Sequence, residues 1–223
     1  MRTLVKFITA ATMLAAAPLG AQGAVRLQLA PGSQLTFTGT STMHGFTCTT
    51  KELQAYIDVD QGYRTKDLST LARPIVGVQV VIPVKSLSCG GDLEKNMYKT
   101  LRADQYPYIT YKLSNYDLVA AQTSAAALAA DTKGKLAISG AENGFAMRVE
   151  ATRAEDGLIT ATGEQTMKMS DFGIKPPTFM LGALRVGDEL KVRFTLKATS
   201  PAVASAMHGL GLADVTGITF QQQ

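Results

Sequence analysis

Tryptophan is absent from the sequence, and cysteine and histidine occur only twice each. Neither His44 nor His208 belongs to an HxH, HxxxH or HExxH spacing that could gather the ligands of a zinc ion. The chain also lacks the GxSxG motif of serine hydrolases. Its basic residues form no block of the kind that binds nucleic acid. These absences predict a protein with no catalytic residues, no metal site, no cofactor and no nucleic-acid partner.

The first residues have the composition of a secretory signal peptide. Arg2 and Lys6 precede an apolar run that ends in small residues near 21–24. The run is broken by Pro18 and is shorter than the ~20 residues of a membrane-spanning helix. We therefore predict that residues 1–23 are removed on export. The mature protein would be periplasmic or secreted and would have no stable membrane anchor; a retained anchor is the alternative.

The remaining chain has the charge and length of one ordinary soluble domain. Without Arg2 and Lys6, the 22 Lys and Arg residues fall to 20 against 18 Asp and Glu, which leaves a net charge of about +2. About 200 residues remain, which is a normal size for a single domain.

Two cysteines in an exported chain predict one disulfide bond, Cys48–Cys89. It would close a loop of roughly 40 residues, which contributes about 4 kcal/mol in the chain-entropy description. The alternatives are a reactive thiol pair or ligands for a soft metal. The absence of a CxxC spacing argues against both alternatives.

Most of the chain after residue 33 has the period-two alternation of β-strands, in about eight short segments. Charged residues occupy many of the alternate positions, as in an antiparallel sheet with one buried face. The pattern predicts an all-β protein, either a closed barrel or a sandwich. A barrel of about eight strands is filled by its own side chains or holds one slender ligand. The residues expected on the inner face include Leu35, Phe37, Leu53, Ala55, Ile57, Val59, Val76, Val78, Val80, Ile82, Val84, Ile109, Tyr111, Leu113, Phe145, Met147, Val149, Leu190, Val192, Phe194 and Leu196.

One segment, "GGDLEKNMYKTLRADQYP", has a helical rather than a strand pattern. Leu93, Met97 and Leu101 follow one another at intervals of four, so they share one helix face. Asp92 is the expected N-cap, and Pro107 prevents continuation. We predict one short amphipathic helix that covers or plugs one end of the barrel.

Two further segments are less regular. Residues 120–134 are rich in alanine and low in complexity, and we expect a surface loop or a short helix there. The tail at 199–223 follows the last clear strand and is punctuated by glycine. We expect it to add a final strand or a loosely packed helix.

The segments "SQLTFTGTSTMHGFT" (33–47), "VVIPVKSLSCGGDLEKNMYKTLRADQYPYITYKL" (80–113) and "GEQTMKMSDFGIKPPTFMLGALRVGDELKVRFTL" (163–196) occur in that order. Together they resemble the YceI-like family. The first resembles its opening strand and histidine, the second its strand, short helix and Tyr-Pro, and the third its closing hairpin. The resemblance spans about residues 33–198.

The resemblance implies a lipocalin-like antiparallel β-barrel in the bacterial periplasm. It also implies that a long apolar molecule of the polyisoprenoid kind lies inside the barrel. The barrel domain would cover residues 24–198, with residues 199–223 as a C-terminal extension of the same domain. The chain departs from commoner family members in its two cysteines, its alanine-rich insertion and this extension.

We predict that the ligand site is the inner wall of the barrel, with His44 near the opening. An alternative role for His44 is to fix the first hairpin through neighbouring hydroxyl or backbone groups. For each of the other side chains the alternative is simple core packing. The predicted ligand-binding residues are Phe37, His44, Val80, Ile82, Tyr111, Met147, Met167, Phe172 and Phe194.

Met167 and Met169 form an MxM pair on one strand face, and thioethers of this kind select Cu(I). Met97, Met147 and Met180 also fall at inward or helix-face positions. Flexible methionines that line an adaptable apolar cavity account for all of them. A copper carrier therefore remains a minor alternative.

The sequence thus predicts an exported, non-enzymatic protein that binds an apolar isoprenoid or lipid-like small molecule. The main alternative is a ligand-free structural or interaction module whose barrel is filled by its own side chains. The cavity volume distinguishes the two, because a filled core leaves no lined tunnel. The sequence leaves a homodimer open.

Overall fold

The computed structural model describes residues 23–64, 70–121 and 128–201. The predicted signal peptide up to residue 22 and the predicted strand or helix of the tail after residue 201 lie outside these ranges. Within them, no helix combines the length and the apolar character needed to cross a membrane.

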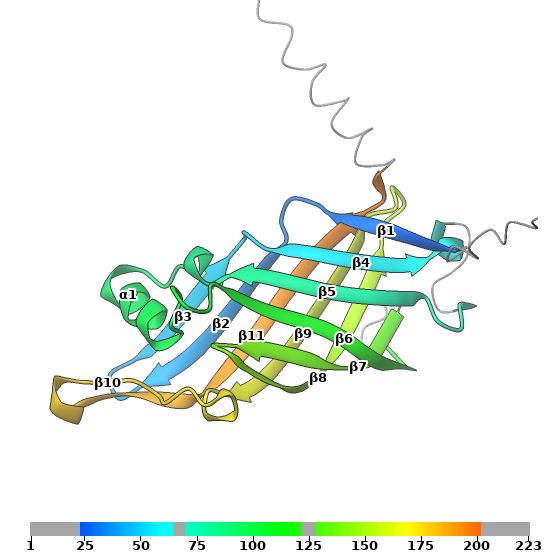
Figure 1. Cartoon of the computed structure of the whole chain (residues 1–223). Coiled ribbons are helices and arrows are strands. Elements are labelled where there is room, and N and C mark those ends of the chain that lie inside the picture. The colour runs from blue at the N-terminus through cyan, green and yellow to red at the C-terminus, as the bar shows by residue number, and fades with distance from the viewer. Residues whose placement is uncertain (1–22, 65–69, 122–127, 202–223) are drawn as a thin grey trace, which may run out of the picture.

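The described chain is built from strands, one α-helix and short 3-10 turns, as Figure 1 shows. The strands are β1 (Ala24–Leu29), β2 (Gln34–Ser41), β3 (Gly45–Thr50), β4 (Gln54–Asp60), β5 (Ile75–Pro83), β6 (Tyr108–Val119), β7 (Leu128–Ile138), β8 (Ala141–Arg153), β9 (Ile159–Lys168), β10 (Thr178–Phe179) and β11 (Leu184–Thr199). The helix is α1 (Gly91–Thr100), and the 3-10 turns are η1 (Gln61–Arg64), η3 (Val84–Ser86), η4 (Ser170–Phe172) and η5 (Met180–Gly182). β1, β3 and the two-residue β10 are additional to the eight segments that the sequence pattern predicted as strands.

The strands close into an antiparallel barrel. The order β1-β4-β5-β6-β7-β8-β9-β11 is completed when β11 pairs back with β1, through Gln28 opposite Thr199 and Leu29 opposite Ala198. The ring therefore has eight strands. The predicted fold class, a lipocalin-like all-β barrel with one short helix, is confirmed.

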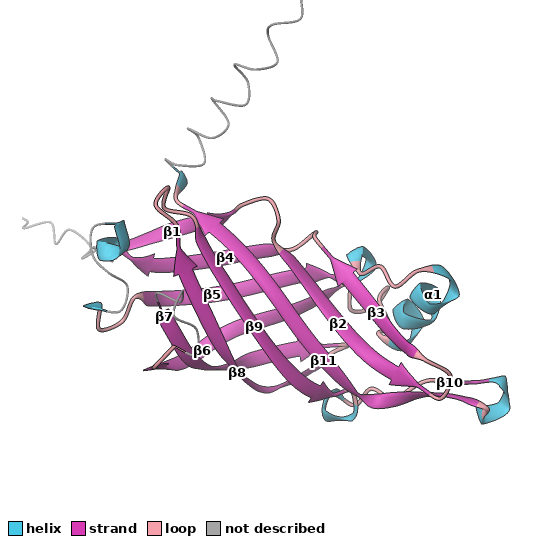
Figure 2. Ribbon diagram, turned by 180° about the vertical axis from the view of Figure 1, so that it is seen from behind, coloured by secondary structure: helices cyan, strands magenta, loops and turns pink. Residues whose placement is uncertain are grey.

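The wall divides near α1. β11 pairs with β2 from Val186 to Thr195, and β2 pairs with β3, so the β2–β3 hairpin continues the sheet beyond β1 (Figure 2). β3 forms no ladder with β5; within the described ranges it makes only an isolated bridge on that side, between Thr49 and Ser88. The segment that connects β5 to α1 therefore lies where β3 and β5 separate. The helix α1 lies there as well.

Two clusters of buried apolar side chains occupy opposite ends of the barrel. One gathers around Leu27, Val59 and Tyr63, at the end where β4 leads into η1. The other gathers around Phe172 and Ile174, at the end where β9 leads into η4. The strands between them form a tube with packed side chains at each end.

The prediction of a short helix is confirmed, and only its start differs. Leu93, Met97 and Leu101 all face the barrel interior. The N-cap is Gly90 and not Asp92, which lies in the first turn. Gly90 has φ 83°, a conformation that glycine adopts without a steric penalty, and this lets the helix begin at Gly91, two residues earlier than an Asp92 N-cap would give.

The inward position predicted for Val76 is wrong. The β4–β5 register shifts so that Asp58 pairs with Gly77, whereas Val59 pairs with Ile75, and Val76 is the extra residue. A bulge of this kind interrupts the period-two alternation. Ile75 therefore faces the interior, and Val76 is 59% exposed.

The prediction of a loop or short helix at residues 120–134 is wrong for the part from residue 128 to residue 134. From Leu128 onward the chain is strand β7, and Leu128, Ala130 and Thr132 alternate into the interior. Residues 122–127 lie outside the described ranges. Small alanine side chains gave the strand a weak hydrophobic pattern, although they are buried in the fold.

The predicted disulfide joins Cys48 of β3 to Cys89, two residues before α1. Further contacts hold the same connection. The Tyr98 hydroxyl lies 2.9 Å from the carbonyl oxygens of both Lys85 and Leu87, to which it can donate. The Glu94 carboxylate accepts a hydrogen bond of 2.9 Å from the Ser88 hydroxyl, which lowers the pKa of Glu94. The disulfide thus anchors the helix entrance to the edge of β3.

We expect the double substitution Cys48→Ala/Cys89→Ala to lower the free energy of unfolding by roughly 2–5 kcal/mol, because the reduced chain gains loop entropy when unfolded. Urea unfolding followed by circular dichroism measures this. A reductant should destabilise the native sequence by a similar amount and leave the double variant unchanged. Equal stability of the oxidised native protein and the double variant would contradict this assignment.

Candidate ligand-binding cavity

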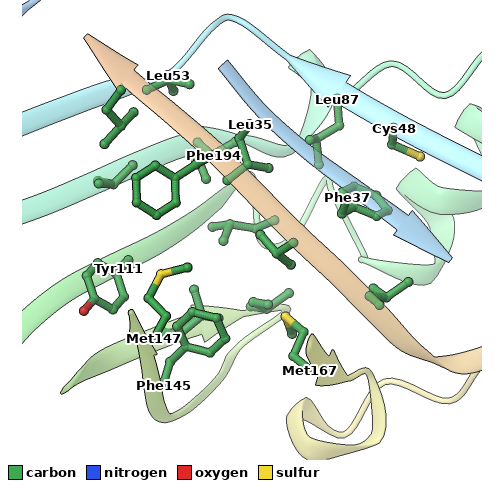
Figure 3. Close-up of a pocket in the computed structure, with 18 of the residues that line it drawn as sticks. Leu35, Phe37, Cys48, Leu53, Leu87, Tyr111, Phe145, Met147, Met167 and Phe194 are labelled. Atoms are coloured by element: carbon green, nitrogen blue, oxygen red, sulfur yellow. The ribbon is translucent and has the colours of Figure 1, made fainter. Parts of the chain in front are cut away.

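A cavity of about 300 Å³ lies inside the barrel, between the two end clusters. Small-molecule cavities in proteins span roughly 300–1,000 Å³, so this one is large enough for a slender ligand. Its wall draws on every strand of the eight-membered ring, on β2 and β3, and on α1. Figure 3 shows part of this lining, with labelled side chains from β2, β3, β6, β8, β9 and β11.

The lining is almost wholly apolar. Among the described residues, no Asp, Glu, Lys, Arg or His side chain belongs to it. The polar side chains that do are Asn96 and Thr100 of α1, Thr132 of β7 and Tyr111 of β6. The space therefore suits a hydrocarbon and offers few hydrogen-bonding groups.

Most of the side chains predicted to bind a ligand face this cavity together. They are Phe37, Val80, Ile82, Tyr111, Met147, Met167 and Phe194. Their contact with a ligand stays a prediction; their convergence on one space is a feature of the fold. The period-two pattern succeeded here because these strands keep one face inward.

His44 is not part of the lining. It is exposed in the turn between β2 and β3, where its Nδ1 lies 2.9 Å from the Gly45 carbonyl oxygen and donates to it. The Ser41 hydroxyl donates to the His44 carbonyl oxygen at 2.7 Å and accepts from the His44 amide at 3.2 Å. His44 and Ser41 thus hold the hairpin turn, which is the alternative role considered for this histidine.

Phe172 is also not part of the lining. It is buried at the end of the barrel, in the cluster with Leu136, Met169 and Ile174 that bounds the cavity there. The η4 turn ends at Gly173, whose φ of 66° reverses the chain direction. Ile174 rather than Phe172 therefore reaches the cavity.

Several lining residues were missing from the predicted site. Phe46 lies on β3, which was not predicted as a strand, and Ile75 was hidden by the bulge. Leu128, Ala130 and Thr132 come from the alanine-rich segment, where the alternation from Leu128 to Ile138 would have revealed them.

Glycines on neighbouring strands leave room for the large aromatic rings beside the wall. A Cβ atom at Gly163 of β9 would lie 2.6 Å from the Phe194 ring, and one at Gly134 of β7 would lie 2.5 Å from the Tyr111 ring. The ring of Phe46 covers Gly39 in the same manner. Without a Cβ below it, each ring lies over the glycine and leaves the centre of the barrel free.

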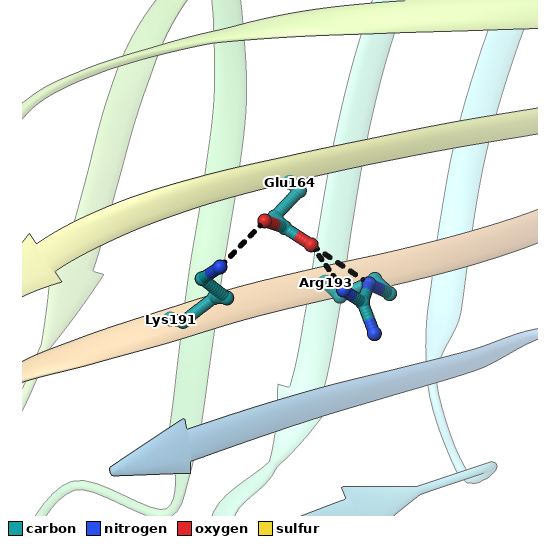
Figure 4. Close-up of polar contacts among 3 residues, drawn as sticks. All are labelled: Glu164, Lys191 and Arg193. Carbon is teal, nitrogen blue, oxygen red and sulfur yellow. Dashed lines mark hydrogen bonds and ion pairs between the residues drawn. The ribbon is translucent and has the colours of Figure 1, made fainter.

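The outer face carries the charges. Glu164 of β9 accepts hydrogen bonds from Lys191, at 3.0 Å, and from Arg193, whose Nε lies 2.9 Å away (Figure 4). These two cations lower the pKa of the Glu164 carboxyl. Exposed ion pairs of this kind add little stability. Lys191 and Arg193 alternate along β11 with the inward residues Val192 and Phe194. The two cations therefore mark the solvent-exposed face of β11.

Met167 and Met169 both face the cavity, as predicted for the MxM pair. Their neighbours include Leu136, Ile138 and Ile174. Within the described ranges, no group of three or more His, Cys, Asp or Glu residues is placed to hold a metal ion.

The sequence from residue 28 to residue 198 matches the YceI-like domain family. The chain belongs to the YceI-like family. No curated protein matches the sequence. Among solved structures, BcnA from Burkholderia cenocepacia is 19% identical, with a TM-score of 0.58 over 75% of this chain and 96% of BcnA. The family resemblance inferred from the sequence is confirmed.

Two more solved structures share the YceI-like fold. A domain from Saccharophagus degradans, described as polyisoprenoid-binding and implicated in plant cell wall breakdown, is 15% identical, with a TM-score of 0.55 over 80% of this chain and 99% of that one. The YceI protein of Campylobacter jejuni is 18% identical, with a TM-score of 0.51 over 69% and 84% of the two chains. At these identities the likeness extends to the fold alone.

We expect Gly163→Ala to lower the free energy of unfolding by about 1–3 kcal/mol, because the new methyl group overpacks against Phe194. The carbonyl oxygen of Arg148 would lie 2.9 Å from that methyl carbon and cannot move without disturbing the β8–β9 ladder. Urea unfolding of the purified variant measures the change.

The matched control is Gly144→Ala on β8, where a Cβ atom would meet nothing within 4 Å. It should leave stability unchanged or raise it by about 0.5–1 kcal/mol, since alanine has less backbone freedom to lose than glycine. Equal effects of the two substitutions would show that Gly163 is not needed to seat the ring.

Proposed function

We propose that this YceI-like protein is exported and holds an apolar molecule, isoprenoid or lipid-like, inside its barrel. The observation that carries the proposal is the cavity of about 300 Å³, to whose lining the described part of the chain contributes no charged side chain. Each methylene group transferred from water into such a space gains about 0.8 kcal/mol. A chain of several isoprene units would therefore bind mainly through its hydrocarbon.

The main alternative, a barrel filled by its own side chains, is less well supported. A filled barrel interior is packed as densely as other protein cores and leaves no lined space. Here the aromatic rings lie over glycines at the wall, and the centre stays open. The description of the Saccharophagus degradans domain as polyisoprenoid-binding points in the same direction.

We further propose that the ligand enters beside α1. The separation of β3 from β5 is covered there by side chains of the helix, including Leu93 and Met97, rather than by a ladder of backbone hydrogen bonds. Side-chain contacts separate more easily than a strand ladder. The Cys48–Cys89 disulfide would keep the start of the helix in place while its later turns move.

Export to the periplasm is part of the same proposal. The composition of residues 1–23 fits a signal peptide, and a disulfide bond persists in an oxidising compartment. Neither the sequence motifs nor the polar side chains of the cavity supply a nucleophile with a general base, so binding without catalysis is the proposed activity.

Native mass spectrometry of the mature protein, purified without detergent, tests this function. We expect a stoichiometric apolar adduct that extraction with organic solvent removes. A bare mass that stays unchanged after incubation with polyprenol vesicles would favour the ligand-free module instead.

Met147→Lys should abolish the adduct, because it places an ammonium group in a lining that has no partner for it. The matched control is Ala146→Lys, whose side chain is exposed on the same strand, and it should keep the adduct. Circular dichroism establishes that both variants fold. A folded Met147→Lys protein that still carries the adduct would contradict the proposed interior site.

A further inference from the structure

The two most exposed large apolar side chains of the described chain lie on neighbouring loops. Met43, in the turn between β2 and β3, is 70% exposed, and Leu181, in η5, is fully exposed. The loops are joined by Thr42, whose amide and hydroxyl donate to the carbonyl oxygens of Arg185 and Ala183, at 3.0 and 3.2 Å. Two distant parts of the sequence therefore meet in one apolar tip, formed by Met43 and Leu181.

The backbone at Leu181 does not favour a leucine. Its φ of 54° and ψ of 30° lie in the left-handed region, which glycine enters freely and which a residue with a β-carbon resists. Turn positions of this kind favour Gly, Asn or Asp. The side chain is fully exposed, so it adds nothing to the core. An apolar side chain held in solvent at an unfavourable backbone conformation points to a contact outside the chain.

The apolar tip lies at the α1 end of the barrel. Figures 1 and 2 both show the β10–β11 hairpin projecting from the end at which α1 lies. Nearer the barrel, Phe46 of β3, Phe179 of β10 and Val186 of β11 line the cavity. Apolar side chains therefore follow both loops from the cavity lining to the tip. The proposed ligand entrance beside α1 is at this same end.

The segments that form the tip carry positive charge only. Residues 39–50 and 172–187 contain Lys175 and Arg185 but no Asp or Glu. Both cations are exposed, and neither forms an ion pair with a described residue. The charge of these segments is therefore not balanced within them.

Arg185 lies at the tip itself, because its Nε donates to the Gly182 carbonyl oxygen at 3.0 Å. The nearest acids along the sequence, Asp171 and Asp188, are placed at η4 instead, where Asp188 accepts a hydrogen bond of 2.8 Å from the Ser170 amide. Exposed apolar side chains beside unpaired cations are the combination that binds an anionic lipid surface.

A second copy of this chain fits the tip less well. A twofold contact places the same surface opposite itself, so Lys175 and Arg185 would face the same cations of the other copy. The tip also offers only two large apolar side chains, whereas a stable interface buries about 800 Å² on each partner. A lipid surface needs neither a matching shape nor so large an area.

We propose that the apolar tip docks this protein reversibly on a bilayer that contains anionic phospholipid. Met43 and Leu181 enter the interface, while Lys175 and Arg185 face the lipid phosphates. Two apolar side chains and two cations are too few for a permanent anchor, so the contact is weak and is screened by salt. This inference goes beyond the proposed binding function, and it brings the α1 end of the barrel against the membrane.

Co-sedimentation of the mature protein with vesicles tests the docking. The vesicles contain phosphatidylcholine alone, or equal parts of phosphatidylcholine and phosphatidylglycerol. Leu181→Asn removes the apolar side chain at a φ that asparagine tolerates. The matched control is Val76→Thr, which removes an apolar side chain that is 59% exposed at the other end of the barrel, beside Ile75. Circular dichroism establishes that the variants fold.

We expect the native protein to bind the vesicles that contain phosphatidylglycerol and to be released by high salt. Leu181→Asn should weaken this binding by about 10-fold, the effect of one leucine side chain that is no longer buried. Arg185→Gln should weaken it by about 5-fold and make it less sensitive to salt. Val76→Thr should bind as the native protein does.

A native protein that does not bind these vesicles, or a Leu181→Asn protein that binds them equally well, would overturn the proposed docking. A dimer in sedimentation velocity that Leu181→Asn abolishes, without vesicle binding, would assign the tip to a second copy instead. Neither result changes the adduct in the cavity, which native mass spectrometry detects separately.

Discussion

The closed ring of backbone hydrogen bonds is the constraint on which the rest of this structure depends. β11 pairs with β9 along one side, and along the other it pairs first with β2 and then with β1. Every ring strand pairs with two neighbours, so backbone hydrogen bonds close the ring along at least part of each strand. The wall can therefore keep its shape around a space that its own side chains do not fill, provided that each strand directs apolar residues inward.

That space depends on a balance between large and small residues across neighbouring strands. The rings of Phe194 and Tyr111 occupy space that a Cβ atom at Gly163 or Gly134 would take, so the two glycines let these rings lie close to the wall. The end clusters then pack densely and limit the length of the cavity.

Sequence periodicity located most of this wall, since Phe37, Val80 and Phe194 alternate regularly along unbroken strands. It failed wherever the backbone departs from that repeat. The bulge in β5 exchanged Val76 for Ile75, and the 3-10 turn at Phe172 put that ring into the cluster at the end of the barrel. Pattern alone also does not distinguish a hollow barrel from a filled one, because the difference depends on which glycine lies beneath which ring on the adjacent strand.

The central claim is that the barrel is hollow and holds an apolar molecule. A crystal structure of the mature protein, purified without removal of bound lipid, tests it most directly. The account predicts continuous elongated density inside the ring, running from beside Tyr111 toward Leu27, with the Phe194 ring flat over Gly163. A lumen filled by interdigitated side chains, with no space between the two end clusters, would contradict it.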